Sequence, residues 1–483
     1  MQQSIAKNAV FNILYKALNV FFPFISASYV SHILLSSGVG KVAYAQNIAQ
    51  YFVLLAPLGL KTYGVKQIAK NRNDKYKRNK KFSELFLINF VSTTIFSLIY
   101  YIIIFNISYF EENRLLFCVT GLAIVFNYIN IDWFYEGIEQ YAYIAIRSFI
   151  IKLVSLIMLF IFVKSPRDYV IYALIYVLAI GGNYIFNIIR LKTYDVKLIF
   201  SELNILMHLK SVFILLLNAM VLDLFALFDT SMLGYICDDN VVGYYSNAMK
   251  LVKVVVSLIT AISGVLLPRL SYNLENNYNY ECKTLIKKVF TYMLYIIIPS
   301  IVGLNLLSDS IIVFVFGKSF LPASNTLKLA SILILVLAVS YFFGTQILIT
   351  FNCEWKLFMC SFIGMITNLT LNFILIPKMY QDGAVIASVA SETISAICIY
   401  IFARRYTGNI IDFKVFMYII PSVIIMASYI NIIKFLSLST SLEVCFSIFG
   451  GGIIYVLILL VFDKNIRGDF TKLIMKLKKK RKI

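Results

Sequence analysis

Apolar residues gather in fourteen long stretches along this chain, and polar residues gather in the short gaps between them. Each stretch has roughly the 20 residues that an α-helix needs to cross a bilayer core. The stretches lack the period-2 alternation of a membrane β-barrel strand. We therefore predict an all-α integral membrane protein with about 14 transmembrane helices. The predicted spans are residues 8–31, 42–65, 82–107, 115–135, 142–163, 169–190, 209–236, 241–266, 284–307, 322–349, 356–377, 382–403, 413–433 and 442–462.

Composition agrees with this pattern. The chain of 483 residues is 60% hydrophobic, with a mean hydropathy of +0.83, well above a soluble globular protein. The first apolar run is too long for the core of a cleavable signal peptide and lacks a clear cleavage site, so we predict that it is the first transmembrane helix.

The net charge of +20 is unevenly distributed over the gaps. Lysine and arginine are concentrated in alternate gaps, chiefly 66–81, 190–210 and 269–288, and in the tail. The positive-inside rule places these segments in the cytoplasm, together with both termini. We expect the basic tail, Lys476 to Lys482, to contact anionic lipid headgroups rather than nucleic acid.

Two segments of the chain repeat. Val39-Gly40 is followed by Ala45, and Val242-Gly243 is followed at the same offset by Ala248. Six predicted spans separate the copies, so both have the same orientation. This favours two parallel lobes related by an axis along the membrane normal. We expect an N-terminal lobe over 1–190, a C-terminal lobe over 191–406, two added helices over 407–465 and a basic cytoplasmic tail over 466–483.

Basic residues inside the predicted spans are candidates for function, because a charge within hydrocarbon is costly. Lys16, Lys61, Lys250 and Lys253 are the candidate substrate-binding residues. Lys16 and Lys61 have an alternative, which is to extend toward the interface. Lys250 and Lys253 lie one turn apart and could instead form buried ion pairs with Asp223 or Asp229.

Acidic residues inside the spans are candidates for coupling to an ion. Asp223, Asp229 and Glu392 are the three candidates, for proton or sodium movement. Glu392 could instead be neutral, because desolvation favours a protonated carboxyl. If the basic groups face one cavity, they form a cationic site suited to a phosphate headgroup.

Several motifs resemble those of one protein family. The stretch Asp132-Trp133-Phe134-Tyr135-Glu136-Gly137-Ile138-Glu139-Gln140-Tyr141, with Arg147 and Lys152 beyond it, resembles the fourth-to-fifth helix signature of Wzx-type O-antigen and polysaccharide flippases. These belong to the multidrug/oligosaccharidyl-lipid/polysaccharide (MOP) exporter superfamily. Further similar segments are Phe22-Pro23, Gly40 to Gln46, Tyr63-Gly64, Ser83-Glu84-Leu85, Asp229-Thr230, Val242-Gly243-Tyr244-Tyr245 and Phe316-Gly317.

The resemblance implies a MATE-like fold of two six-helix lobes with two extra C-terminal helices. It also implies alternating access around a cationic cavity, in the bacterial inner membrane. The implied cargo is a polyprenyl diphosphate-linked oligosaccharide for O-antigen, capsule or other exopolysaccharide assembly, with a polysaccharide polymerase or exporter as possible partner. Basic residues on the first, second and eighth helices are the expected headgroup contacts.

The residues of the signature have physical roles of their own. Trp133 and Tyr135 are expected near the inner interface, where aromatic belts form. Asp132, Glu136, Glu139 and Arg147 are expected to form a structural ion network rather than to contact cargo.

Two other functions agree less well with the sequence. A cation-coupled multidrug exporter of the same superfamily would need an acidic cavity, which the intramembrane lysines disfavour. A membrane enzyme is disfavoured because the outer gaps are short and the only histidines are His32 and His208, expected at a helix end and in a loop. We therefore expect a transporter with no cofactor and no metal site.

Overall fold

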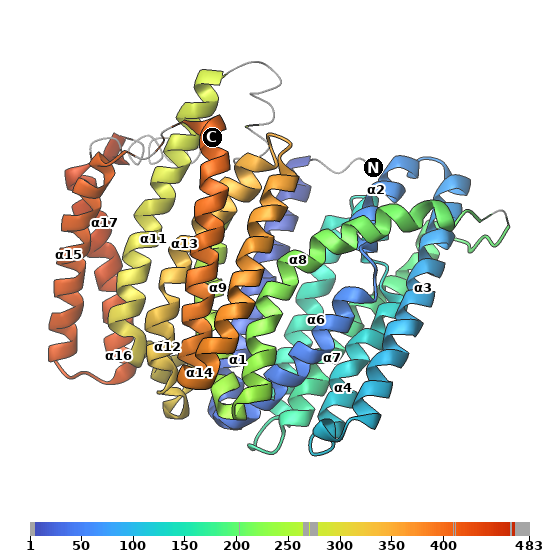
Figure 1. Cartoon of the computed structure of the whole chain (residues 1–483), viewed down its shortest axis with the longest axis horizontal. Coiled ribbons are helices and arrows are strands. Elements are labelled where there is room, and N and C mark those ends of the chain that lie inside the picture. The colour runs from blue at the N-terminus through green and yellow to red at the C-terminus, as the bar shows by residue number, and fades with distance from the viewer. Residues whose placement is uncertain are drawn as a thin grey trace, which may run out of the picture. The chain divides into compact units, whose positions relative to one another are not determined.

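The computed structural model describes the backbone of residues 5–201, 203–263, 270, 279–408, 410, 412–463 and 466–468. It describes their side chains apart from those of residues 5–21, 218–219, 221–226, 262 and 279–280. All regular secondary structure in this part of the chain is helical (Figure 1). The prediction of an all-α membrane protein is confirmed, and the chain is a multi-pass membrane protein.

Nine helical segments of the described chain are long and apolar enough to cross a membrane, and further apolar helices are shorter. Two of the nine contain a residue with positive φ inside a helix. The first is broken at Leu35, whose φ is 59°, within α1 (Ile5–Leu55). The other is broken at Tyr380, whose φ is 51°, within α14 (Glu354–Thr407). A positive φ in a residue with a Cβ interrupts helical hydrogen bonding, so each break separates two neighbouring predicted spans.

The chain divides into two compact units. The first comprises residues 1–247 and 369–384. In it α3 packs against α4, and both α4 and α6 pack against α7. Helix α1 contacts α4, α6 and α8. Its further helices are α2 (Leu60–Asn71), α3 (Lys75–Asn106), α4 (Arg114–Val125), α5 (Asp132–Gly137), α6 (Tyr141–Phe162), α7 (Tyr169–Leu191), α8 (Leu206–Ile236) and the start of α9 (Asp239–Ser263), with 3-10 turns at Ser108–Phe110, Phe126–Ile129 and Lys192–Tyr194.

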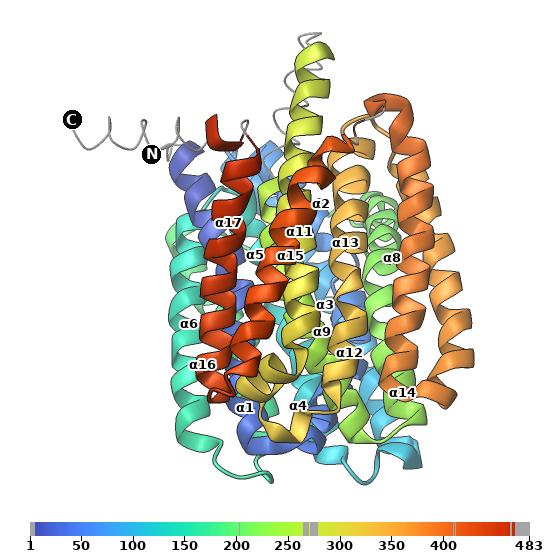
Figure 2. The same cartoon turned by 90° about the vertical axis from the view of Figure 1, so that its left-hand side faces the viewer.

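The second unit comprises residues 248–368 and 385–483. Its long helix α11 (Asn279–Phe316) packs against α12 (Ala323–Ala330), α13 (Ile332–Ser340), α15 (Lys414–Phe435) and α16 (Thr440–Cys445). Figure 2 shows α15 beside α17 (Gly451–Phe462), and these two helices are in contact. The unit also contains most of α9 and α14, two π-helical segments, Tyr341–Leu348 and Phe446–Gly450, and a 3-10 turn at Lys318–Phe320.

Helix ends differ from the apolar boundaries where a helix continues into water. Helix α3 starts at Lys75 rather than at residue 82, because Asp74 caps it by accepting a hydrogen bond from the Lys77 amide at 3.0 Å. The second predicted span is not continuous. Helix α1 ends at Leu55, and Leu58 (φ 47°) and Gly59 (φ 77°) turn the chain into α2. A Cβ on Gly59 would lie 2.8 Å from the Val212 carbonyl oxygen, so α8 leaves no room for a side chain there.

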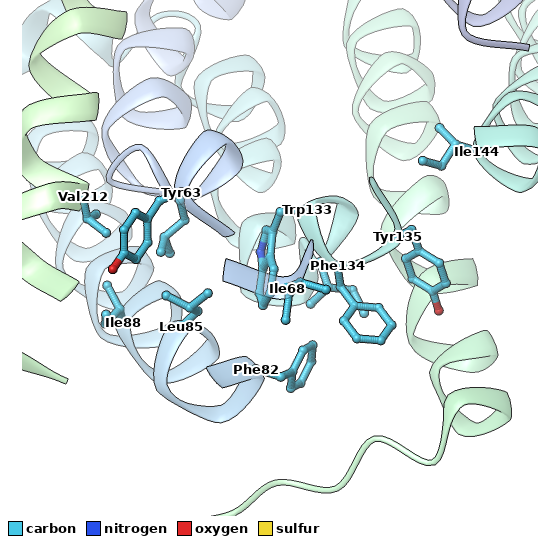
Figure 3. Close-up of a cluster of buried hydrophobic side chains, with 12 residues drawn as sticks. Tyr63, Ile68, Phe82, Leu85, Ile88, Trp133, Phe134, Tyr135, Ile144 and Val212 are labelled. Carbon is cyan, nitrogen blue, oxygen red and sulfur yellow. The ribbon is translucent and has the colours of Figure 1, made fainter. Parts of the chain in front are cut away.

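Aromatic and aliphatic side chains from α2, α3, α5, α6 and α8 form a buried cluster in the first unit (Figure 3). The Phe82 ring centroid lies 5.4 Å from that of Trp133 and 5.5 Å from that of Phe134. The Tyr135 hydroxyl donates to the Asn187 carbonyl at 2.6 Å. Trp133 and Tyr135 are only 3% and 0% exposed. The expectation that Trp133 and Tyr135 belong to an aromatic belt is therefore wrong. The short helix α5 places both rings in the protein interior and not at the lipid surface.

Candidate functional site: the repeat crossing and the polar layer beside it

The two copies of the internal repeat pack against each other. A Cβ on Gly40 would lie 1.7 Å from the Asp239 carbonyl oxygen, and a Cβ on Gly243 would lie 2.3 Å from the Ser36 carbonyl oxygen. Asp239 is the repeat equivalent of Ser36, just as Gly243 is the equivalent of Gly40. The contact is therefore symmetric, and only glycine allows it. We call Ser36, Gly40, Asp239, Asn240 and Gly243 the repeat crossing.

Polar groups join the two helices at the crossing. The Ser36 hydroxyl donates to the Asn240 side-chain oxygen at 2.6 Å. The Lys41 ammonium lies 3.9 Å from carboxylate oxygens of both Asp239 and Glu112. Burial raises the pKa of Asp239, with Glu112 adding to the rise and Lys41 opposing it. Asp239 is partly exposed and Glu112 is largely exposed, so these ion pairs contribute little to stability.

A cavity of about 410 Å³ opens beside the crossing. Lys41, Glu112 and Asp239 line it, with Tyr44 and Tyr109. Lys41 and Glu112 were absent from the predicted site. The signal that could have found Lys41 is its position directly after Gly40 of the repeat.

Further along α1 and α9 lies a layer of buried polar side chains. The Asn47 amide donates to the Ser231 hydroxyl at 2.7 Å, and the Tyr51 hydroxyl pairs with the same oxygen at 2.8 Å. The Asn247 amide donates to the Ser31 hydroxyl at 2.7 Å, and both residues are fully buried. Such groups are costly in a membrane interior unless they are paired, so the helices must meet in this register.

Asp229 lies in this layer and is 2% exposed. Its carboxylate accepts hydrogen bonds from the Tyr245 hydroxyl at 2.5 Å and from the Asn372 amide at 2.6 Å. Helices α8, α9 and α14 thus converge on one acidic group. Buried carboxyl oxygens need such donors, because a polar group within hydrocarbon is costly unless it is hydrogen-bonded.

A second buried acid lies at the α3–α8 contact. Glu84 is 0% exposed, and its Oε2 accepts a hydrogen bond from Lys81 at 2.7 Å while its Oε1 accepts one from the Asn204 backbone N–H at 2.9 Å. His208 Nε2 lies 2.8 Å from Glu84 Oε2, the same oxygen that accepts from Lys81. On the other side of the ring, His208 Nδ1 lies 2.7 Å from the Tyr63 hydroxyl. The expectation that His208 is a loop residue is wrong. Helix α8 starts earlier than its apolar run, at Leu206, and carries His208 into the core.

Of the four residues expected to form an ion network at α5, Asp132 and Arg147 pair with each other, and Glu139 pairs outside the set. Arg147 donates to Asp132 at 3.1 Å and to the side-chain oxygen of Asn183 at 3.1 Å, and it also contacts Asn187. Glu139 pairs with Arg72 at 2.8 Å. These contacts tie α2, α5, α6 and α7 together, which is a structural role.

Residues 5–274 match the family model described as polysaccharide biosynthesis protein. The chain belongs to this family. A candidate O-antigen transporter of Shigella dysenteriae is 25% identical over 384 residues, which are 78% of this chain and 94% of that protein. Capsular polysaccharide biosynthesis protein CapF of Staphylococcus aureus is 24% identical over 76% of this chain and 91% of its own length.

The fold is also shared with solved structures. Lipid II flippase MurJ in an inward closed conformation superposes with a TM-score of 0.76 at 17% identity, over 95% of this chain and 99% of that one. An inward-facing multidrug resistance MATE family transporter of the MOP superfamily superposes with a TM-score of 0.57 at 14% identity, over 85% and 96%. The predicted MATE-like fold is confirmed, and the family match confirms the predicted relation to polysaccharide biosynthesis proteins. The expectation of a transport protein rather than an enzyme is confirmed by the relatives.

The seven residues predicted from the sequence to bind substrate or to couple to an ion differ in burial and position. Lys61 is exposed in the first turn of α2, where its charge opposes the rise that burial produces in the pKa of Glu136. Lys250 is half-buried and Lys253 exposed in α9, and Glu392 is half-buried in α14. The side chains of Lys16 and Asp223 lie outside the described residues. Asp229 belongs to the polar layer described above, and the roles of all seven residues stay predictions.

Proposed function

We propose that this protein is a flippase that moves a polyprenyl diphosphate-linked oligosaccharide across the bacterial inner membrane. The observation that carries the proposal is the repeat crossing beside a layer of buried polar side chains. A transporter needs one side of its pathway closed while polar groups within the membrane remain available to the cargo. Similarity to glycan transporters over most of the chain supports the same function.

In the proposed cycle, the crossing of α1 and α9 is closed when the pathway faces the cytoplasm. The diphosphate is held by Lys16, Lys61, Lys250 and Lys253, since lysine binds phosphate as a point charge and can release it. The polyprenyl tail stays in lipid. Both termini face the cytoplasm, in accord with the basic gaps between spans.

Ion coupling is proposed through Asp229, with Asp223 and Glu392 as the further candidates. The donors to Asp229 come from α9 and α14, so a relative movement of these helices would change the stability of its charge. A proton or sodium ion bound at this carboxylate would thereby be linked to the conformation.

The test is transport by the purified protein in proteoliposomes, with a fluorescent polyprenyl diphosphate glycan placed in one leaflet. Wild-type protein should move the probe between leaflets, and Lys250→Glu should not, because the reversed charge repels the diphosphate. Arg114→Glu, which reverses a half-exposed surface charge outside the site, is the matched control.

A multidrug exporter is the alternative, and the MATE-like fold favours it. Export of cationic dyes by the wild-type protein that persists in Lys250→Glu, together with no movement of the glycan probe, would reject the flippase and support the exporter.

A further inference from the structure

The cavity beside the repeat crossing is large enough for a small ligand. Its volume of about 410 Å³ lies within the range of roughly 300–1,000 Å³ that is usual for small-molecule pockets. Most of its wall comes from three gaps between predicted spans, residues 32–41, 108–114 and 237–240. These gaps alternate with the strongly basic ones, so the positive-inside rule predicts that the cavity opens on the outer side of the membrane.

Charged groups of both signs line this cavity. The carboxylates belong to Glu112, Asp238 and Asp239, and the ammonium belongs to Lys41. The Lys41 ammonium lies 3.9 Å from an oxygen of Asp239 and 3.9 Å from an oxygen of Glu112. Both distances exceed hydrogen-bonding distance. These three groups therefore attract one another without a direct hydrogen bond, and a ligand atom can bond to two of them at once.

This mixture of charges disfavours a simple ion as the ligand. A cation would meet the Lys41 ammonium, and an anion would meet three carboxylates. Burial raises the pKa of Asp239, with Lys41 opposing the rise and Glu112 and Asp238 adding to it. The protonated form of Asp239 donates a hydrogen bond as well as accepting one. The cavity thus offers donors and acceptors together, which suits an uncharged polar ligand.

A hydroxyl group is the ligand group that best matches this arrangement. It accepts a hydrogen bond from an ammonium and donates one to a carboxylate at the same time. A hydroxyl oxygen placed between Lys41 and Asp239 can reach both, because their contact atoms are 3.9 Å apart. The side chain of Asn113, which also lines the cavity, adds an amide donor and an amide acceptor. A ligand with several hydroxyl groups would use all of these.

An aromatic side chain supplies the other part of the match. Tyr109 lines the cavity and is 46% exposed, and its hydroxyl donates to the Gly234 carbonyl at 2.7 Å. This hydrogen bond fixes the ring in place. Tyrosine offers a rigid contact area that accepts both polar and apolar groups. A sugar ring has hydroxyl groups at its edge and C–H groups on its faces, so it fits the charged groups and the aromatic ring together.

We propose that this cavity is a subsite for an uncharged sugar ring of the transported glycan, on the outer side of the membrane. The inference rests on the proposed function for the source of the sugar. Lys41 follows Gly40 directly, and Asp239 belongs to the repeat crossing. A sugar bound here therefore lies next to the helices that close the pathway in the proposed cycle.

The experiment measures the binding of single sugars to the full-length protein by saturation-transfer NMR at neutral pH. The protein is held in lipid nanodiscs, because glycoside detergents would add sugar rings of their own. Glucose, glucosamine and glucuronate are the probes, since they share one ring and are neutral, cationic and anionic. The cavity variant is Lys41→Gln with Glu112→Gln. The control is Glu111→Gln with Arg114→Gln, which also removes one charge of each sign, from an ion pair in the same region that does not line the cavity.

Glucose should bind wild type more tightly than either charged sugar. The cavity variant should lose at least about 10-fold of this affinity, because hydrogen bonds to charged groups are lost, and the control should bind as wild type does. Tightest binding of glucosamine or of glucuronate would overturn the assignment to an uncharged sugar. Equal glucose binding by the two variants, or no binding by wild type, would overturn the subsite.

Failure of the subsite can be distinguished from failure of the proposed function. Movement of the fluorescent glycan in proteoliposomes, with no difference in sugar binding between the variants, would reject the subsite alone. Glucose binding that depends on Lys41 and Glu112, in a protein that moves no glycan, would support the subsite and reject the flippase. Thermal unfolding of both variants without sugar verifies that they are folded.

Discussion

Gly40 and Gly243, which occupy equivalent positions of the internal repeat, face each other where α1 crosses α9. A Cβ on Gly40 would lie 3.0 Å from the Gly243 backbone nitrogen, and the converse distance is 3.3 Å. A weak sequence repeat thus becomes a physical contact between its two copies. Transporters built from repeats can place such contacts on the pathway that opens and closes.

The first prediction concerns side-chain size at the crossing. Gly40→Ala and Gly243→Ala should each lower the free energy of unfolding by about 1–3 kcal/mol, because the added methyl group meets backbone atoms that cannot move away easily. Thermal unfolding in detergent measures the effect. Gly303→Ala is the control, since nothing lies within 4 Å of a Cβ there, and replacing a helical glycine in open space should stabilise slightly. Equal effects at all three positions would contradict a close crossing.

The second prediction tests whether the crossing opens during transport. Cysteines replacing Ser36 and Asn240, whose side chains are hydrogen-bonded, should be joined by a short thiol-reactive cross-linker in a chain whose seven native cysteines are replaced. Cross-linking should stop glycan movement in proteoliposomes, and cleavage of the linker should restore it. The matched pair is Thr94 and Tyr128, which are also hydrogen-bonded in the first unit but away from the repeat. Normal transport after cross-linking at 36 and 240 would show that the crossing stays closed.

The third prediction concerns Asp229. Asp229→Asn keeps the shape but removes the charge, so transport should lose its dependence on an imposed ion gradient and slow by at least about 10-fold, as hydrogen bonds to a charged group contribute about 1.5–3 kcal/mol. Tyr245→Phe removes one donor and keeps the carboxylate, so it should reduce the rate while preserving the gradient dependence. An unchanged response to the gradient in Asp229→Asn would exclude this residue from coupling.

The fourth prediction concerns the buried acid at the α3–α8 contact. Glu84→Gln should lower the free energy of unfolding by about 3–5 kcal/mol, because it leaves the buried His208 and the partly buried Lys81 without their carboxylate. Glu111→Gln, which breaks an exposed pair with Arg114, should cost about 0–1 kcal/mol. Melting temperatures of both variants in one detergent give the comparison, and similar losses would show that the Glu84 network is not a structural anchor.

The apolar pattern alone predicted the class of fold, because crossing a bilayer demands long helices whatever their packing. Residues 142–163 and 413–433 became α6 and α15 with shifts of one or two residues. The same physics could not predict the break at Leu58 and Gly59, where contact with α8 rather than hydropathy ends the helix.

Candidate site residues divide in the same way. The cost of a charge in hydrocarbon places Asp229 among seven candidate residues from the sequence alone, and the family motifs indicate glycan transport. Only the tertiary structure brought Asn372 and Tyr245 to Asp229, buried His208 against Glu84, and joined Lys41 to Glu112 and Asp239. Hydropathy is a property of each segment, and it therefore determines which segments enter the membrane. Partnership between polar groups depends on how helices far apart in sequence are aligned in three dimensions, and that alignment follows from packing such as the contact of Gly40 with Gly243.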